Sequence, residues 1–589
     1  MRPRLWTTAA VLACFLALPP WPPGTARAES AATGQPLERL YDNTAVGVDG
    51  QPSGTGFDGA GNALSAGDLA AAGWTPGRTL TLGGATFTLP RYAPGRPDNL
   101  VADGQRVRLT GRGSSLSLLV AATGGPAAGT GTLRYRDGSR QSFTLGAPDW
   151  RTGPLGSKAV ALPHVNSPGG QLTEQAKLYA VSVPLERRRA LASVQLPRDN
   201  GPDLHVFAAS VQSGSPGWSG SWAAATSGQP AVGPWADRSL RLVVHTSAGG
   251  PRVRVRLDNT FASAPVDIGG ASVAVQESGA TAASDPRPLR FGGATGTRIA
   301  AGAQALSDPL DFEVPADSNL LVSFHLPGTV ASAPLHQLAV QESYLSEGGD
   351  HTAERTGEAY TGTLTNWPLL AGVDVGGGPG SVVVLGDSIT DGERTTAGAN
   401  RRWPDLLADR LRGQREVPRY GVLNQGISAN RVLSDRYPGD GVSTDTGGVS
   451  ALNRLERDVL AQTSARTVIL FMGVNDVRWG ARADQVSAGL REIAARARAR
   501  GLKVLAATIA PCQGESRCTA QVEAERAAVN AQLRTGAGFD AVLDFDAVLR
   551  DPANPARLAP AYDSGDHLHP SEAGLAALAD SVELGLLRN

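Results

Sequence analysis

Continuous apolar runs alternate with amphipathic stretches of helical period over the last third of the chain. The runs lie at 382–385, 420–423, 467–472, 503–509 and 541–545. Apolar strands that alternate with helices form a parallel sheet covered by helices on both faces. We therefore expect a three-layer α/β domain over 376–589, beginning at a linker of four glycines and one proline.

The pattern before this linker consists of short apolar-polar alternations separated by glycine, proline and other turn residues. In a first region, over 37–211, we expect strands at 79–82, 86–89, 106–109, 115–120, 131–135 and 141–145. A second region, over 218–357, has strand-like runs at 239–245, 252–257, 271–276, 311–314 and 320–324. Short strands at this spacing are typical of antiparallel sandwiches, so we expect two β-sandwich domains.

The first 28 residues have the pattern of a secretory signal peptide. Two arginines precede an apolar run at 5–18, prolines follow, and the small-x-small site Ala-Arg-Ala ends at Ala28. The run is too short for a membrane anchor, and no later stretch approaches the roughly 20 apolar residues of a membrane-spanning helix. We expect cleavage after Ala28, export of the mature chain, and no stable membrane insertion. Cys14 leaves with the signal.

Length and charge exclude some classes of function. At 589 residues the chain exceeds one ordinary core, which agrees with several domains. The formal net charge of -1, with charges scattered along the chain, provides no basic field for nucleic acid. Nucleic acid is therefore not an expected partner.

Cys512 and Cys518 remain after cleavage, six positions apart. In an exported chain, two nearby thiols predict a small disulfide loop. The alternative is structural zinc, which needs four ligands, and this stretch has no nearby histidine or aspartate. We also assign no metal to His245, His325 and His336. The first two stand at the ends of strand-like runs, where a hydrogen-bonded structural histidine is the commoner outcome.

Residues of catalytic type directly follow the predicted parallel strands. Ser388 ends a Gly-Asp-Ser run after the first strand, Gly426 follows the second, and Asn475 follows the third. A later loop carries Asp566 and His569. Because ligands bind outside the carboxyl ends of the strands in such sheets, we expect these segments to meet at one edge.

These residue types are those of a serine nucleophile with its helpers. A serine hydroxyl needs a base, most often a histidine whose tautomer a carboxylate holds, and Asp566 and His569 fit that pair. The tetrahedral oxyanion needs donors, which we expect from the N–H groups of Ser388 and Gly426 and from the Asn475 amide. Glycine suits this role because it has no Cβ to block a close approach. No cofactor is needed.

Neighbouring side chains offer rival roles. His567 is an alternative base, but it is adjacent to Asp566 in the chain, and adjacent side chains diverge. Asp387 and Asp391 are alternatives as glycosidase acids, although carboxylates at a strand-to-helix turn more often accept hydrogen bonds from backbone N–H groups.

The four segments together resemble the SGNH, or GDSL, hydrolase family, named for its serine, glycine, asparagine and histidine. The resemblance implies a flavodoxin-like domain in which Ser388 is the nucleophile, Gly426 and Asn475 donate to the oxyanion, and Asp566 and His569 complete the triad. One departure is the Ser-Ala-Asn sequence at 428–430, where the family has Gly-Gly-Asn.

A narrower resemblance comes from the runs at 386–392 and 399–404, which are similar to a secreted actinobacterial subgroup associated with xylan-degrading gene clusters. It begins near Trp218 and includes the second sandwich.

The first region, 37–211, resembles β-sandwich modules appended to secreted glycoside hydrolases, through short motifs at 41–43, 57–59, 97–99 and 135–138. This resemblance implies carbohydrate binding or wall docking, for which an exposed Trp74 or Trp150 would offer an aromatic face. The alternative is a spacer sandwich with both aromatic side chains in its core.

The motifs and the resemblance together predict a secreted serine carboxylic ester hydrolase that forms an acyl-enzyme. Export and two sandwiches favour acetylated polysaccharide as the ester substrate. A lipase or arylesterase of short-chain acyl preference is the alternative within the family. A non-catalytic glycan-binding protein is the alternative of another class.

Overall fold

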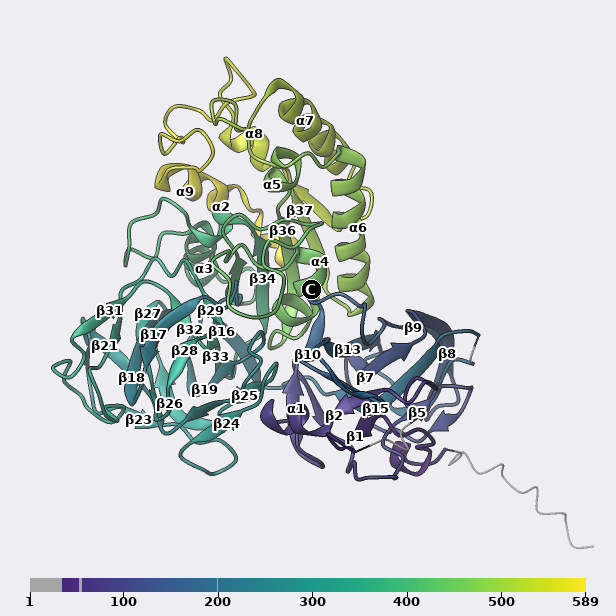
Figure 1. Ribbon diagram of the computed structural model, residues 1–589. Helices are drawn as coiled ribbons and strands as arrows, with labels where there is room; N and C mark the ends of the chain where they lie inside the picture. Colours follow the sequence, from purple (N-terminus) through teal and green to yellow (C-terminus); the bar gives the residue numbers. More distant parts are fainter. Residues whose placement is uncertain (1–33, 52–55, 199, 589) are drawn as a thin grey trace, which may run out of the picture.

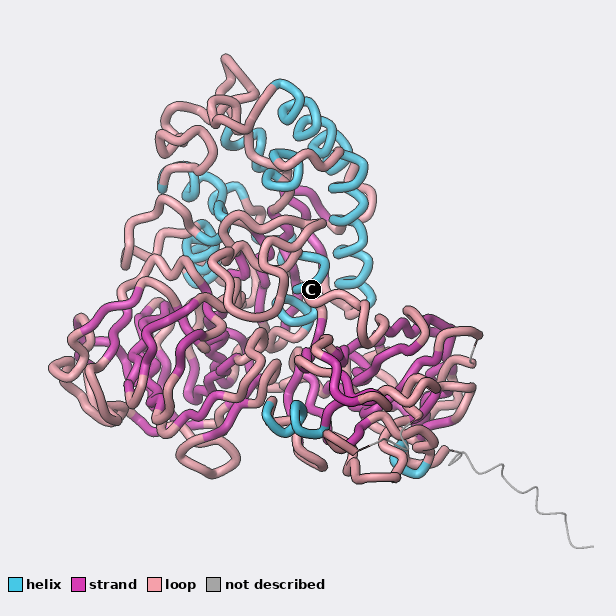
Figure 2. The backbone as a smooth tube through the Cα atoms, viewed as in Figure 1, coloured by secondary structure: helices cyan, strands magenta, loops and turns pink. Residues whose placement is uncertain are grey.

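The computed structural model describes residues 34–51, 56–198 and 200–588. The predicted signal peptide and its cleavage site lie outside these residues. The described chain has two β-rich parts and one α/β part that contains most of the helices (Figures 1 and 2). No helix among the described residues is long and apolar enough to cross a membrane.

The α/β part contains the predicted parallel sheet of five strands. The order is β35-β34-β36-β37-β38, and every neighbouring pair is parallel. The strands are β34 (Ser381–Gly386), β35 (Gly421–Gly426), β36 (Ala465–Phe471), β37 (Lys503–Ala507) and β38 (Ala541–Leu543). The first strand of this domain, β34, is second in the sheet. The prediction of a three-layer, flavodoxin-like domain is confirmed.

Helices cover both faces of this sheet, which explains why its strands are apolar throughout. Val383 and Leu385 pack on one face and Val382 and Val384 on the other, in two separate cores. The first core is completed by α4 (Ala451–Leu455), α6 (Ala483–Ala499) and α7 (Ala520–Arg534). The second is completed by α3 (Trp403–Arg412), α8 (Phe545–Leu549) and α9 (Glu572–Ser581).

The first β-rich part contains two mainly antiparallel sheets around a shared core. One sheet has the order β10 (Lys158–Leu162), β13 (Ala176–Pro184), β7 (Ser115–Thr123), β15 (Asp203–Gln212) and β5 (Leu100–Val101). The other has β6 (Arg106–Val107), β14 (Leu191–Gln195), β8 (Ala127–Tyr135) and β9 (Arg140–Ala147). Trp74 and Trp150 are 1% and 2% exposed, so both lie in the core, as the spacer alternative expects, and neither offers an aromatic face to a sugar.

The second β-rich part likewise has two large sheets. One is β16 (Trp218–Ala223), β33 (Leu370–Gly376), β19 (Gly250–Asp258), β25 (Gln304–Leu306), β3 (Thr79–Leu82) and β4 (Ala85–Thr88). The other is β22 (Thr281–Ala282), β21 (Ala271–Ser278), β27 (Ser318–Leu326), β18 (Arg238–Thr246), β30 (Ser343–Leu345) and β31 (Gly362–Leu364).

Two features of these sheets differ from the predicted domain ranges. The hairpin β3–β4 was expected inside the first sandwich, but Thr81 pairs with Gln304 and adds the hairpin to the sheet of the second part. The buried Trp74 indole also donates to the Ala301 carbonyl across this junction at 2.8 Å. The second part continues past residue 357, because β33 is a central strand of its sheet.

The second β-rich part packs directly on the edge of the parallel sheet. Its strand β16 lies beside β35, and the N–H of Gly220 in β16 also donates to Ser381 Oγ of β34 at 2.8 Å. The N–H of Val422 donates to Ser247 Oγ at 2.9 Å. A Cβ on Gly421 would lie 2.0 Å from the Gly220 carbonyl oxygen, so this contact admits no side chain.

Candidate active site

Ser388 lies where the sheet passes into a short helix. It is the first residue of α2 (Ser388–Asp391), directly after β34, and the Asp387 carboxylate accepts from the Ile389 N–H at 3.1 Å. A first-turn N–H has no acceptor within its own helix, so the Ser388 N–H points outward from the helix start. The serine is thereby held at the carboxyl end of the sheet.

His569 and Asp566 reach Ser388 from the loop before α9. His569 Nε2 lies 2.9 Å from Ser388 Oγ, and His569 Nδ1 lies 2.7 Å from Asp566 Oδ2. Asp566 Oδ1 accepts the N–H groups of His569 and Leu568 at 2.8 and 3.0 Å, and Arg394 Nε donates to Asp566 Oδ2 at 3.1 Å. The three predicted residues therefore form one continuous chain of hydrogen bonds.

The electrostatics of Asp566 favour its ionised form. Partial burial raises the pKa of Asp566, but the hydrogen bonds from His569 and Leu568 lower it by a larger amount. The net pKa lies well below the usual range. An ionised Asp566 keeps a proton on His569 Nδ1. His569 Nε2 is then left as an acceptor for the Ser388 hydroxyl proton.

The rival base His567 points to a different partner. Its Nδ1 lies 2.6 Å from Asp563 Oδ2, and its ring packs against Gly514. His567 also has a φ of 64°, which turns its side chain away from that of its neighbour Asp566. This geometry favours His569 over His567 as the base.

Asn475 is fixed on α5 (Val474–Arg478) with its amide oriented by two contacts. Its Oδ1 accepts from Arg478 Nη1 at 3.0 Å, and its Nδ2 donates to the Asn430 carbonyl at 3.1 Å. An amide nitrogen carries two protons, so one Asn475 proton remains for another acceptor. Arg478 was not singled out in the sequence, because only the fold shows that it orients Asn475.

Gly426 does not fit the donor role expected from the sequence. Its N–H donates to Asn424 Oδ1 at 2.9 Å. A Cβ at Gly426 would lie 2.3 Å from the Asp391 nitrogen, so the glycine instead allows β35 to pack closely on α2. The structure thus disfavours Gly426 as an oxyanion donor, because its N–H is already engaged.

Ala429, three residues after Gly426, has a left-handed backbone and a backbone N–H that is available as a donor. Its φ is 63°, a left-handed value that glycine adopts most easily, and its N–H has no acceptor among the described residues. On one side Ser428 N–H donates to Asp391 Oδ2 at 2.7 Å, and on the other Asn430 contacts Asn475. The signal available in the sequence was the Ser-Ala-Asn departure at 428–430.

Asp391 connects this site to the second β-rich part through a buried histidine. Asp391 Oδ1 lies 2.9 Å from His336 Nε2, while His336 Nδ1 lies 2.8 Å from the Ala225 carbonyl. Both ring nitrogens of His336 face oxygen atoms and the pKa of His336 is raised beside Asp391, which favours an imidazolium paired with the Asp391 carboxylate. Asp387 and Asp391 are both engaged in structural contacts, which disfavours a role as glycosidase acids.

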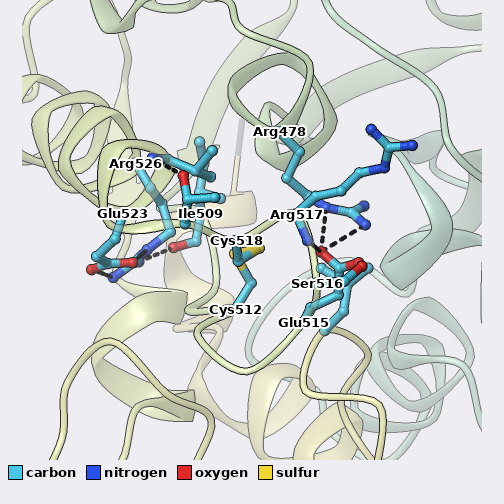
Figure 3. The surroundings of a disulfide bond; sticks show 12 residues. Arg478, Ile509, Cys512, Glu515, Ser516, Arg517, Cys518, Glu523 and Arg526 are labelled. Carbon is cyan, nitrogen blue, oxygen red and sulfur yellow. Dashed lines mark hydrogen bonds and ion pairs between the residues drawn. A yellow bond between two sulfur atoms is a disulfide. The ribbon is translucent and has the colours of Figure 1, made fainter.

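A disulfide closes a short loop beside Arg478 (Figure 3). Cys512 and Cys518 are bonded, and both are buried. Within the loop, Glu515 accepts from Arg478 at 3.0 Å, so the disulfide loop supports the arginine that orients Asn475.

Comparison with protein families gives two matches. Residues 384–577 match the GDSL-like Lipase/Acylhydrolase family, and residues 33–215 match the AziU2-like beta-sandwich domain. No curated protein matches the chain.

Solved structures similar to this chain cover about a third of it. A putative lipolytic protein of the G-D-S-L family from Desulfitobacterium hafniense is 21% identical over 34% of this chain and 96% of its own, with a TM-score of 0.27. A putative acylhydrolase from Bacteroides fragilis is 20% identical over 35% and 88%, with a TM-score of 0.27. A mutant acetyl-xylooligosaccharide esterase from Geobacillus Stearmophilus is 23% identical over 35% and 93%, with a TM-score of 0.27.

The parallel sheet, the strand-end serine and the family match together define a hydrolase. Residues 384–577 of the α/β domain are similar to the GDSL-like lipase/acylhydrolase family.

Proposed function

We propose that this protein is an exported serine esterase that hydrolyses carboxylic esters through an acyl-enzyme. The observation that carries the proposal is the hydrogen-bonded chain from Ser388 Oγ through His569 to Asp566. Export is supported by the N-terminal leader and by the disulfide, since disulfides persist mainly in oxidising compartments.

The reaction proceeds in two steps. His569 Nε2 takes the proton of Ser388 as its oxygen attacks the ester carbonyl, and the protonated histidine then returns it to the departing alcohol. The Ser388 N–H, the Ala429 N–H and the Asn475 amide donate to the oxyanion. Water, deprotonated by the same histidine, then releases the acid and restores the serine.

Replacing the nucleophile tests this mechanism. Ser388→Ala should lower kcat/KM on 4-nitrophenyl acetate by roughly a thousandfold or more, because the base has no hydroxyl to activate. Ser581→Ala, at the exposed end of α9, is the control and should match the wild type. If Ser388→Ala retained wild-type activity, the triad assignment would be wrong, and the non-catalytic alternative would gain support if neither protein were active.

We further propose that the substrate is a polysaccharide that carries acetyl esters. The predicted export signal and the two β-rich parts support this choice. Acetate released from acetylated xylan, compared with acid released from long-chain esters, tests it. Release from long-chain esters alone would favour a lipase instead.

A further inference from the structure

Trp479 is an exposed indole beside the proposed oxyanion site. It is 41% exposed, whereas every other tryptophan among the described residues is buried. Trp479 directly follows α5, and its backbone N–H donates to the Asn475 carbonyl at 3.2 Å. Trp479 therefore lies about one helical turn after Asn475.

Four arginines surround this indole. The guanidinium carbons of Arg517, Arg431, Arg478 and Arg436 lie 4.7, 4.8, 5.1 and 6.0 Å from the Trp479 ring centre. They come from three segments, namely the loop after β35, helix α5 and the disulfide loop. We call Trp479 and these four arginines the Trp479 cluster.

The cluster has more positive charge than its own carboxylates balance. Arg436 pairs with Asp445 at 3.1 Å and Arg478 with Glu515 at 3.0 Å. Arg431 and Arg517 form no ion pair within the described part of the chain. The Nε of Arg431 is buried without a hydrogen-bond partner, which is a costly state for a charged donor.

The same three segments contact the proposed catalytic residues. The carbonyl of Asn430, next to Arg431, accepts from Asn475, and Arg478 donates to the same side chain. In the disulfide loop, Gly514 packs against His567, the neighbour of Asp566. Arg478 and Arg517 both lie beside Glu515 in this loop (Figure 3). A group bound to the cluster would therefore lie next to the reacting ester.

We propose that the Trp479 cluster binds a uronate residue of the acylated polysaccharide, so that the enzyme prefers esters on acidic glycans. The inference rests on the proposed function and specifies its substrate class. An indole face packs against the C–H face of a pyranose ring. A guanidinium stacked on an aromatic ring keeps its N–H edge for bidentate binding of a carboxylate. A uronate uses both features, whereas a free phosphate uses the arginines alone.

Deacetylation of a matched pair of glycans tests the preference. The wild type should deacetylate acetylated glucuronoxylan about tenfold more efficiently, in kcat/KM, than its carboxyl-reduced form, the gain expected from a charge-assisted hydrogen bond. The double variant Arg431→Gln/Arg517→Gln should bring this ratio near one. Arg415→Gln also removes one positive charge, at an exposed position before the N-terminal end of β35. This control variant should keep the wild-type ratio.

Binding separates this inference from the esterase proposal. Ser388→Ala should bind oligogalacturonate in calorimetry, more weakly when Arg431→Gln/Arg517→Gln is added and when Trp479→Ala is added. A wild-type glycan ratio near one, an unchanged ratio in the double variant, or no oligogalacturonate binding would overturn the inference while leaving the esterase intact. Equal competition by inorganic phosphate would overturn the uronate class. Full activity of Ser388→Ala would instead overturn the proposed function.

Discussion

At the scale of single residues, the proposed nucleophile lies beside a carboxyl group that is costly to ionise. Burial, with a contribution from Asp476, raises the pKa of Asp387 from 3.8 to about 7. A raised pKa stabilises the fold fully below pH 3.8, and this contribution is lost as the pH rises through about 7.

Asp387→Asn should therefore stabilise the protein at alkaline pH. Asparagine still accepts the Ile389 N–H as a helix cap but carries no buried charge. We expect the difference in unfolding free energy between the variant and the wild type to be larger at pH 8 than at pH 5. Urea denaturation at both pH values measures it. An equal difference at the two pH values would contradict the assigned pKa.

A second prediction concerns two neighbouring small residues with opposite constraints. Gly426→Ala should lower both Tm and esterase activity, because its Cβ would lie 2.3 Å from the Asp391 nitrogen. Ala429→Gly should keep the activity and stay within about 1 kcal/mol of wild-type stability, since relief of left-handed strain offsets the added chain entropy. Wild-type Tm and activity in Gly426→Ala would contradict the close packing of β35 on α2.

These residues also show what the sequence could and could not predict. Ser388, Asp566 and His569 were found because strand ends and a fixed spacing predict their meeting. Gly426 was misassigned because a glycine's purpose depends on what packs against it. His336 received no role from the sequence, because its partner Asp391 belongs to another domain and no pattern along the chain relates the two.

At the scale of elements, local patterns were reliable and partnerships were not. The parallel strands were predicted because helices cover both of their faces, which makes each strand apolar throughout. The hairpin β3–β4 was also predicted, yet its pairing with β25 was not. One-sided alternation shows that a strand has a buried face, not which sheet provides its neighbour.

The disulfide loop is an element whose removal should affect both stability and rate. Cys512→Ala/Cys518→Ala opens a loop with a sequence separation of 6, which should cost about 2 kcal/mol of stability by loop entropy. The kcat/KM on 4-nitrophenyl acetate should also fall several-fold, since Glu515 would hold Arg478 less firmly. Dithiothreitol should lower the Tm of the wild type but not of the variant. An equal effect on both would show that the loop is not the cause.

At the scale of the whole molecule, the three parts are joined by specific polar contacts. Lys158 of the first part lies 3.8 Å from Asp440, in the loop that follows β35, and burial lowers the pKa of Lys158 to about 8. The second part covers the sheet edge at β35, where an unpaired strand would otherwise be exposed. With Trp74 and Trp150 buried, these contacts favour a scaffold role for the first part over sugar stacking.

The ion pair between His336 and Asp391 is the contact through which the second β-rich part should act on catalysis. His336→Ala leaves the buried Asp391 unpaired, so we expect a loss of about 3–5 kcal/mol in unfolding free energy. A lower kcat should accompany it, because Asp391 also holds Ser428, beside the proposed donor Ala429. Adding Asp391→Asn to His336→Ala should recover part of the stability.

The pH dependence of this pair distinguishes charge from packing. Burial lowers the pKa of His336, but the adjacent Asp391 raises it by a larger amount. The net pKa therefore lies above the ordinary value of 6.5. Its stabilisation is therefore complete below pH 6.5 and is lost as the pH rises through the higher folded value. Unfolding free energy should fall with pH in this range for the wild type but not for His336→Ala. His245→Ala, which removes a more exposed pair with Asp317, should cost less than about 1 kcal/mol. If both variants lost the same stability at every pH, His336 would act through packing alone.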